Sequence, residues 1–212
     1  MAVYDLQEQE QIDALKAWWK QHQRLVLLAV AAAILTFGGI SGWRYYQSRQ
    51  ALAAGELYSQ METALNSGDK SKARDIAAAL TAEYPATGYA MLAALVGARV
   101  AVDSGDAAGA QAQLQWLTDH AGDDATRDLA RLRLAALLLD EKKYPDALAL
   151  LETRHGAAWD ALYDNLKGDV LVAQGRTGEA RAAYQAAFDK SAAQNAFRAL
   201  VQTKIDALGG TR

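Results

Sequence analysis

The sequence predicts an all-α protein in which one transmembrane helix precedes a solenoid of helical hairpins that ends in a C-terminal capping helix. Three observations predict it. An uncharged apolar stretch lies near the N-terminus, a short turn motif recurs along the rest of the chain, and the composition favours helices. Alanine is abundant, runs of β-branched residues are scarce, and the 212 residues include only two prolines, Pro85 and Pro145.

The apolar stretch at residues 25–43 contains nineteen residues and no charge. At about 1.5 Å per residue, a helix of this length spans about 28 Å, close to the thickness of the hydrocarbon core of a bilayer. We therefore expect a transmembrane helix over residues 25–46, because a lone helix satisfies all its own backbone groups in lipid. The flanking aromatic residues are of the kind that favours the headgroup zones: Trp18, Trp19, Trp43, Tyr45 and Tyr46.

A cleaved signal peptide is the alternative to a permanent anchor. Such a peptide has a short basic start, a shorter apolar stretch and a small-residue cleavage site, which Gly39 and Ser41 could imitate. Here the apolar stretch follows 24 residues that include four acidic ones, and bulky Trp43 lies just beyond the small residues. We therefore expect an uncleaved anchor.

Residues 1–24 are expected to form a cytoplasmic tail. Ile12, Leu15 and Trp19 share one face of a short amphipathic helix at residues 5–20, which would rest on lipid headgroups or dock on a cytoplasmic partner. The tail carries three Lys or Arg residues against two in the fifteen residues after the span, and a long downstream domain can be translocated whatever its charge. We therefore expect the N-terminus inside and the C-terminal domain outside.

Residues 51–212 are numerous enough to form one sizeable hydrophobic core. They carry 17 Lys and Arg against 21 Asp and Glu, and this net charge of −4 argues against nucleic acid as a partner. The chain has no cysteine, which excludes disulfides and thiolate metal sites.

A turn followed by an alanine recurs through residues 51–212. Three copies begin with glycine, at Gly68, Gly105 and Gly175, and a weaker copy begins at Lys142. The alanines that end the four copies are 37, 37 and 33 residues apart: Ala73, Ala110, Ala147 and Ala180. Periods near 34 residues are typical of helix-turn-helix solenoids. Glycine allows the positive φ that such a turn needs, and alanine lets the second helix approach the first.

The repeated unit resembles the tetratricopeptide repeat. Small and bulky residues match its spacing best in the last unit, at Gly168, Leu171, Ala180, Tyr184 and Ala187. The earlier units match at fewer positions, so we predict a tetratricopeptide-like fold, with an irregular helical bundle as the alternative. Residues 195–208 have their apolar side chains on one face and are expected to form the capping helix that the end of a solenoid requires.

No motif for catalysis or cofactor binding is found. The sequence lacks G-x-G-x-x-G, G-x-x-x-x-G-K-[ST], G-x-S-x-G and H-E-x-x-H, and its three histidines lack the helical spacing of metal ligands. We expect a protein that is not an enzyme, with no catalytic residues, no cofactor and no metal.

Certain first-helix positions of tetratricopeptide units face a concave groove, which here would be largely apolar. Exposed apolar patches usually mark interaction sites, so we expect a partner-binding groove. The alternative is that a neighbouring helix, such as the C-terminal one, covers it. The residues expected to bind the partner are Leu92, Leu95, Arg99, Leu129, Leu132, Leu139, Asn165 and Asp169, and the same mapping adds Val102, Ala136, Leu162 and Val172.

The tail and the exit of the span resemble a specific family. The tail contains Glu8-Gln9-Glu10-Gln11 and Lys16-Ala17-Trp18-Trp19, and the span ends in Gly42-Trp43-Arg44-Tyr45-Tyr46. Together with the repeats, over essentially the whole chain, this resembles the YfgM family of bacterial inner-membrane proteins. The resemblance implies an ancillary subunit of the SecYEG translocon, with a periplasmic domain at residues 51–212 that associates with a PpiD-type chaperone.

Three functional hypotheses remain open. In the first, the protein sits beside the export channel and passes emerging proteins to periplasmic chaperones. In the second, the cytoplasmic tail restrains a stress-response regulator of the RcsB type, to which the resemblance links at least some family members. In the third, the C-terminal domain is an enzyme on a membrane stalk, and a cleft with convergent ionisable groups of perturbed pKa would support it.

Overall fold

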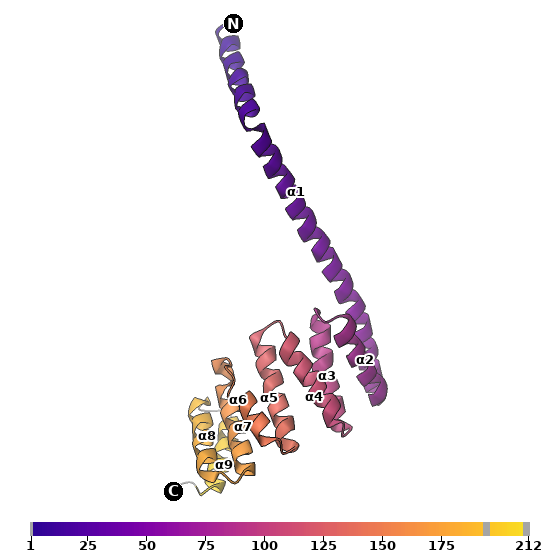
Figure 1. Cartoon of the computed structure of the whole chain (residues 1–212), viewed down its shortest axis with the longest axis vertical. Coiled ribbons are helices and arrows are strands. Elements are labelled where there is room, and N and C mark those ends of the chain that lie inside the picture. The colour runs from indigo at the N-terminus through magenta and orange to yellow at the C-terminus, as the bar shows by residue number, and fades with distance from the viewer. Residues whose placement is uncertain (1, 193–195, 210–212) are drawn as a thin grey trace. The chain divides into compact units, whose positions relative to one another are not determined.

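The computed structural model describes residues 2–192 and 196–209 of the chain, which are drawn as coloured ribbons in Figure 1. Over these residues it contains α-helices, one short 3-10 helix and no β-strand, which confirms the all-α prediction. The chain divides into two compact units, Met1–Gln50 and Ala51–Arg212.

Helix α1 (Ala2–Asn66) makes up the described part of the first unit and also supplies the first helix of the second. The residues of the expected short tail helix form the beginning of α1, so no break separates them from the apolar span. Among the described helices, α1 is the one long and apolar enough to cross a membrane, and none of its most apolar window is buried. Such an exposed apolar surface is unfavourable in water and favourable in the hydrocarbon core of a bilayer.

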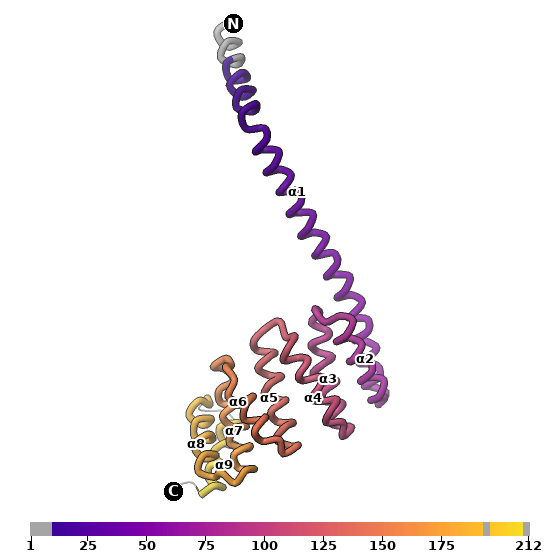
Figure 2. Tube along the Cα trace, viewed as in Figure 1, coloured from indigo at the N-terminus to yellow at the C-terminus, as the bar shows by residue number. Residues whose placement is uncertain are grey.

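The second unit continues as a series of antiparallel helices, each packed against the next along the chain. The tube in Figure 2 follows this order through the second unit. The elements are α2 (Lys70–Glu83), α3 (Gly88–Asp103), α4 (Ala107–His120), α5 (Asp124–Asp140), α6 (Tyr144–Leu151), η1 (Ala157–Trp159), α7 (Asp160–Ala173), α8 (Thr177–Lys190) and α9 (Ala196–Ala207).

The turns inside the four hairpins share one backbone geometry. The residue with positive φ in each is Gly68 (78°), Gly105 (75°), Lys142 (62°) or Gly175 (74°). In the first turn, Gly68 N donates to Leu65 O at 3.0 Å and Asp69 N donates to Ala64 O at 2.9 Å, and the other three repeat this pair of bonds. These bonds satisfy carbonyl groups that the end of a helix leaves without partners. The four turns predicted from the repeated motif are therefore confirmed.

Polar side chains cap the N-termini of several helices. Each cap accepts a hydrogen bond from a backbone N–H three residues later, as Asp106 does from Gly109 at 2.9 Å. The same bond is made by Asp69, Thr87 and Asp123. Helix α6 lacks such a cap and has Pro145 in its first turn, where a missing N–H breaks no helical bond.

Small residues allow the paired helices to approach closely. Ala110 and Ala180 are completely buried, as the repeat pattern predicts. Gly168 of α7 faces the ring of Tyr184 on α8, and a Cβ at this glycine would overlap the ring. A Cβ at Gly97 of α3 would likewise lie only 2.9 Å from Ala77 Cβ on α2. The tetratricopeptide-like spacing of small and bulky positions is thus expressed as contact between helices.

Helix α9 closes the end of the solenoid, as predicted. Val201 and Ile205 are buried in a cluster with residues of α7 and α8, whereas Leu200 points away from it and is exposed. Arg198 donates to Phe188 O at 2.6 Å and to Ser191 O at 2.8 Å, so it satisfies carbonyls at the end of α8. Residue 195, the first of the predicted capping helix, lies outside the described part of the chain.

Candidate functional site

The aromatic residues expected at the two membrane surfaces are all exposed on α1. Between them lie exposed apolar side chains such as Ile34 and Phe37. Near the end of the span, the rings of Trp43 and Tyr46 lie 6.0 Å apart and the Arg49 guanidinium lies 5.6 Å from the Tyr45 ring centre. This part of α1 therefore presents a long apolar surface, with amphipathic and cationic groups at its edge, that suits a bilayer.

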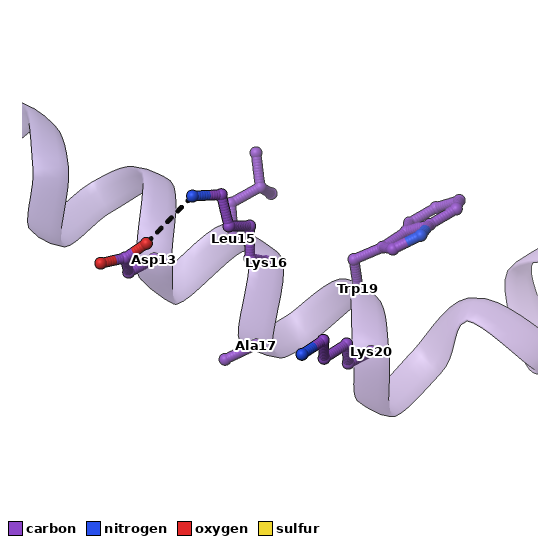
Figure 3. Close-up of a pocket in the computed structure, with 6 residues that line it drawn as sticks. All are labelled: Asp13, Leu15, Lys16, Ala17, Trp19 and Lys20. Carbon is purple, nitrogen blue, oxygen red and sulfur yellow. Dashed lines mark hydrogen bonds and ion pairs between the residues drawn. The ribbon is translucent and has the colours of Figure 1, made fainter.

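A second exposed surface lies on the tail segment of α1. Leu15 and Trp19 project from the same side of the helix in Figure 3, beside an ion pair in which Lys16 Nζ lies 3.2 Å from Asp13 Oδ1. These residues border a hollow of ≈ 660 Å³ that also reaches Lys20. Apolar and basic side chains in this arrangement suit a headgroup layer or the surface of a partner.

A groove lies over the first half of the second unit, and we call it the α3–α5 groove. It consists of two cavities, of ≈ 610 Å³ and ≈ 390 Å³, that share Leu95, Arg99 and Arg133. Its wider end is bordered by Leu65 of α1 and Leu92 of α3. The helical hairpins therefore bring apolar and cationic side chains from separate repeats into one concave surface.

The far end of the α3–α5 groove lies between α3 and α5. It is bordered by Val102, Ala136 and Asp140. Leu92 borders one cavity and Val102 the other, and the two side chains keep 48% and 46% of their surface exposed. An exposed apolar strip of this kind is suited to a partner.

The α3–α5 groove is lined by more cationic side chains than anionic ones, and several of its cationic N–H donors have no acceptor in the part of the chain that the structure describes. Arg99 Nε donates to both carboxylate oxygens of Asp103, at 2.9 and 3.0 Å, which leaves both terminal nitrogens of Arg99 without a bond in the described residues. Lys70 Nζ reaches only the backbone oxygen of Asp103, at 3.4 Å. Arg133 is exposed and, within the described chain, has no hydrogen-bond or ion-pair partner.

Only part of the expected groove is brought together. Leu92, Leu95 and Arg99 border the α3–α5 groove, whereas Leu132 and Leu139 are half-buried and pack against the main core cluster. That cluster spans α3 to α7, so the core takes up apolar positions that the repeat alignment places on the concave face. Leu129 is also half-buried and borders neither cavity.

The fourth-unit residues of the expected groove are engaged by the capping helix. Lys204 of α9 donates to Asn165 Oδ1 at 2.9 Å and to the two oxygens of Asp169 at 2.6 and 2.8 Å. Asp169 also accepts a bond from the Tyr184 hydroxyl at 2.7 Å. Burial, and then this bond to a carboxylate, raise the pKa of Tyr184 above its ordinary value. Asn165 and Asp169 thus hold α9 in place. At this end of the domain the C-terminal helix therefore covers residues that were expected to bind a partner.

A polar cavity of ≈ 500 Å³ lies beside the start of α5. Its floor is Asp128, which is 3% exposed and accepts a bond from Gly156 N at 2.9 Å. Tyr163 donates to the backbone oxygen of Asp128 at 2.8 Å, and burial, followed by the nearby Asp128 charge, raises the pKa of Tyr163 to about 12. These bonds tie the loop before η1 to α5, which is a structural role. The described residues contain no group of three or more His, Asp or Glu placed to hold a metal.

Arg133 is a cation of the α3–α5 groove that was not among the residues expected from the repeat spacing. The alignment placed residues 132 and 136 of α5 in the groove, and only Ala136 borders it. A cation at every 34th residue, at Arg99, Arg133 and Lys167, was the available signal. Lys167 pairs with Glu152 at 3.0 Å and borders neither cavity, so the 34-residue spacing identifies groove residues in two of the three repeats.

Comparison with known proteins gives matches over nearly the whole chain. The family model described as a tetratricopeptide repeat-like domain matches residues 16–210. A protein of Neisseria gonorrhoeae is 33% identical over 96% of this chain and 98% of its own length, and one of Escherichia coli is 32% identical over 98% and 99%. A third, from Haemophilus influenzae, is 30% identical over 95% and 92%. Each of the three is named an ancillary SecYEG translocon subunit. No solved structure matches the chain.

Proposed function

Because this chain belongs to the YfgM family of tetratricopeptide repeat-like proteins, we propose that it is an ancillary subunit of the SecYEG translocon. The observation that carries the proposal is near-full-length similarity to relatives of that name, which includes the apolar stretch as well as the repeats. A helix that is long and apolar enough to span a membrane supports a single-pass inner-membrane protein.

The anchor is proposed to hold the chain beside the channel. Its side chains between the aromatic edges are exposed and apolar, so they can contact lipid and the apolar surface of another membrane helix alike. With the N-terminus in the cytoplasm, residues 51–212 lie in the periplasm, where exported chains emerge. Tethering there raises the effective concentration of the domain for weak partners.

The C-terminal domain is proposed to link exported proteins to periplasmic chaperones, with a PpiD-type chaperone as its partner. The α3–α5 groove supports this role, because it leaves Leu92 and Val102 exposed at the surface of a folded domain. Since no catalytic motif accompanies the groove, its proposed role is binding alone.

In vivo photocrosslinking from the anchor tests association with the translocon. A photoreactive amino acid at Ile34 or Phe37, both exposed on α1, should give adducts with SecYEG subunits. A chain whose residues 25–43 are replaced by an unrelated apolar helix of equal length is the control and should give none. Absence of SecYEG adducts from every anchor position of the natural chain would contradict the proposal.

A second candidate function places the interaction at the tail. Ile12, Leu15 and Trp19 are exposed on one side of α1, which is the observation that favours a docking surface there. In this alternative the tail restrains a response regulator of the RcsB type in the cytoplasm. Adducts with such a regulator from Leu15, without periplasmic adducts from the α3–α5 groove, would favour it over the chaperone role.

A further inference from the structure

We propose that the α3–α5 groove binds an acidic amphipathic segment of a protein partner. This inference rests on the proposed function and names the chemistry of the segment that docks. A segment of this kind places apolar side chains on one face and carboxylates along its edge.

The apolar part of the groove is built to receive a helix face. Leu92, Leu95, Arg99 and Val102 are three or four residues apart on α3, so they lie along one side of that helix. Leu65 extends the apolar surface at the wider end. The exposed surface of Leu92 and Val102 is removed from water only if another apolar surface covers it.

The cationic part of the groove supplies the charge complementarity. Arg99 and Arg133 come from different repeats and both border both cavities. Asp103 occupies one nitrogen of Arg99, and Arg133 has no described partner, so several guanidinium N–H donors remain for carboxylates. These free donors lie in a domain whose net charge is −4, which makes the groove a local exception to the domain's charge.

The anions of the groove set the direction of the docked segment. Asp103 is paired with Arg99 at 2.9 Å, whereas Asp140 has no partner among the described residues. Asp140 borders only the cavity at the far end. Carboxylates of the bound segment therefore lie near Arg99 and Arg133, and its residues next to Asp140 are neutral or basic.

Binding of three matched peptides to the detergent-solubilised full chain tests the inference. The first is a short capped peptide with leucines at helical spacing, flanked by glutamates. The second has glutamine, and the third lysine, at each glutamate position. Fluorescence anisotropy should show that the glutamate peptide binds at least about fivefold more tightly than the glutamine peptide, a preference that weakens at high salt.

Variants of the chain locate the binding. Arg133→Glu should weaken the glutamate peptide by at least about fivefold and improve binding of the lysine peptide. Leu92→Ser should weaken all three peptides and is tolerated by the fold, because Leu92 is already half exposed. Arg154→Glu makes the same charge change at an exposed residue that borders neither cavity of the groove, and it should leave the affinities unchanged.

Equal affinities for the glutamate and glutamine peptides would overturn the inference. An equal effect of Arg154→Glu and Arg133→Glu would overturn it too, since the attraction would then be unspecific. Anchor crosslinking to SecYEG, measured on the same variants, separates this result from the proposed function. If the adducts persist while the peptide preference is absent, only the inference fails, and if the adducts are absent, the proposed function fails.

Discussion

Single small residues determine how the hairpins of this domain pack. Gly168 is one of the positions that matched the tetratricopeptide spacing, and the structure gives the physical reason. The buried ring of Tyr184 occupies the space where a Cβ at residue 168 would lie. The hydroxyl of Tyr184 donates to Asp169, which also accepts a bond from Lys204, so one glycine positions a contact that extends to the capping helix.

Gly168→Ala should therefore destabilise the domain although alanine is the better helix former. Overpacking costs about 1–3 kcal/mol, which equals or exceeds the gain of about 1 kcal/mol from helix propensity. Gly178→Ala is the matched control on the next helix, because a Cβ there has no neighbour within 4 Å. Thermal unfolding followed by circular dichroism should show a lower midpoint for Gly168→Ala only. An unchanged midpoint for Gly168→Ala would mean that Tyr184 moves aside freely.

The sequence predicted buried small residues better than it predicted groove residues. Ala110 and Ala180 follow from turn spacing alone, because each stands at a fixed distance from its turn residue. Asp169 also matched a repeat position, yet its carboxylate is bound by Lys204, 35 residues further along the chain. Such a contact depends on how α9 packs, which local spacing does not encode.

At the scale of elements, the four hairpin turns show how a weak motif preserves a geometry. Lys142 takes the place of glycine in the third turn and still adopts a φ of 62° with the same pair of backbone bonds. Left-handed backbone costs a residue with a Cβ about 1–2 kcal/mol, which the helices on either side must offset. The recurrence of the turn, rather than glycine itself, made the helix boundaries predictable.

Lys142→Gly should raise the free energy of unfolding. The gain should be about 1 kcal/mol, because relief of the left-handed strain is partly offset by the greater freedom of glycine in the unfolded chain. Lys143→Gly is the neighbouring control, since residue 143 has a negative φ of −84° and glycine brings no relief there. Urea denaturation should show stabilisation by the first change and destabilisation by the second. Equal destabilisation by both would contradict a strained turn at Lys142.

The tail and the apolar span form one helix, α1, although the tail was expected to form a separate short helix. The periodicity of residues 5–20 indicated a short separate helix, but the described segment from residue 2 to residue 66 is continuously helical. No glycine-containing turn and no proline lies between the tail and the apolar span, so nothing in the sequence ends the helix there. A change of chemical character along a helix is thus poor evidence for a break in it.

At the scale of the whole molecule, two units with different surfaces account for the proposed function. The first exposes apolar side chains that suit lipid, and the second buries its apolar residues in packed clusters and leaves a limited groove. Membership of the family could be predicted because the tail and the exit of the span carry distinctive residues. The residues that line the groove could not be predicted, because degenerate repeats leave their alignment uncertain by one or two residues.

The proposed function depends most directly on orientation, with the C-terminal domain proposed to lie on the side of the membrane where exported chains emerge. The chain has no cysteine, so a single introduced thiol can be labelled without background. Ala207→Cys near the C-terminus and Gln11→Cys in the tail both replace exposed residues. In intact cells, a membrane-impermeant thiol reagent should label Ala207→Cys, and it should label Gln11→Cys only after permeabilisation. Labelling of Gln11→Cys in intact cells, with Ala207→Cys protected, would contradict the account.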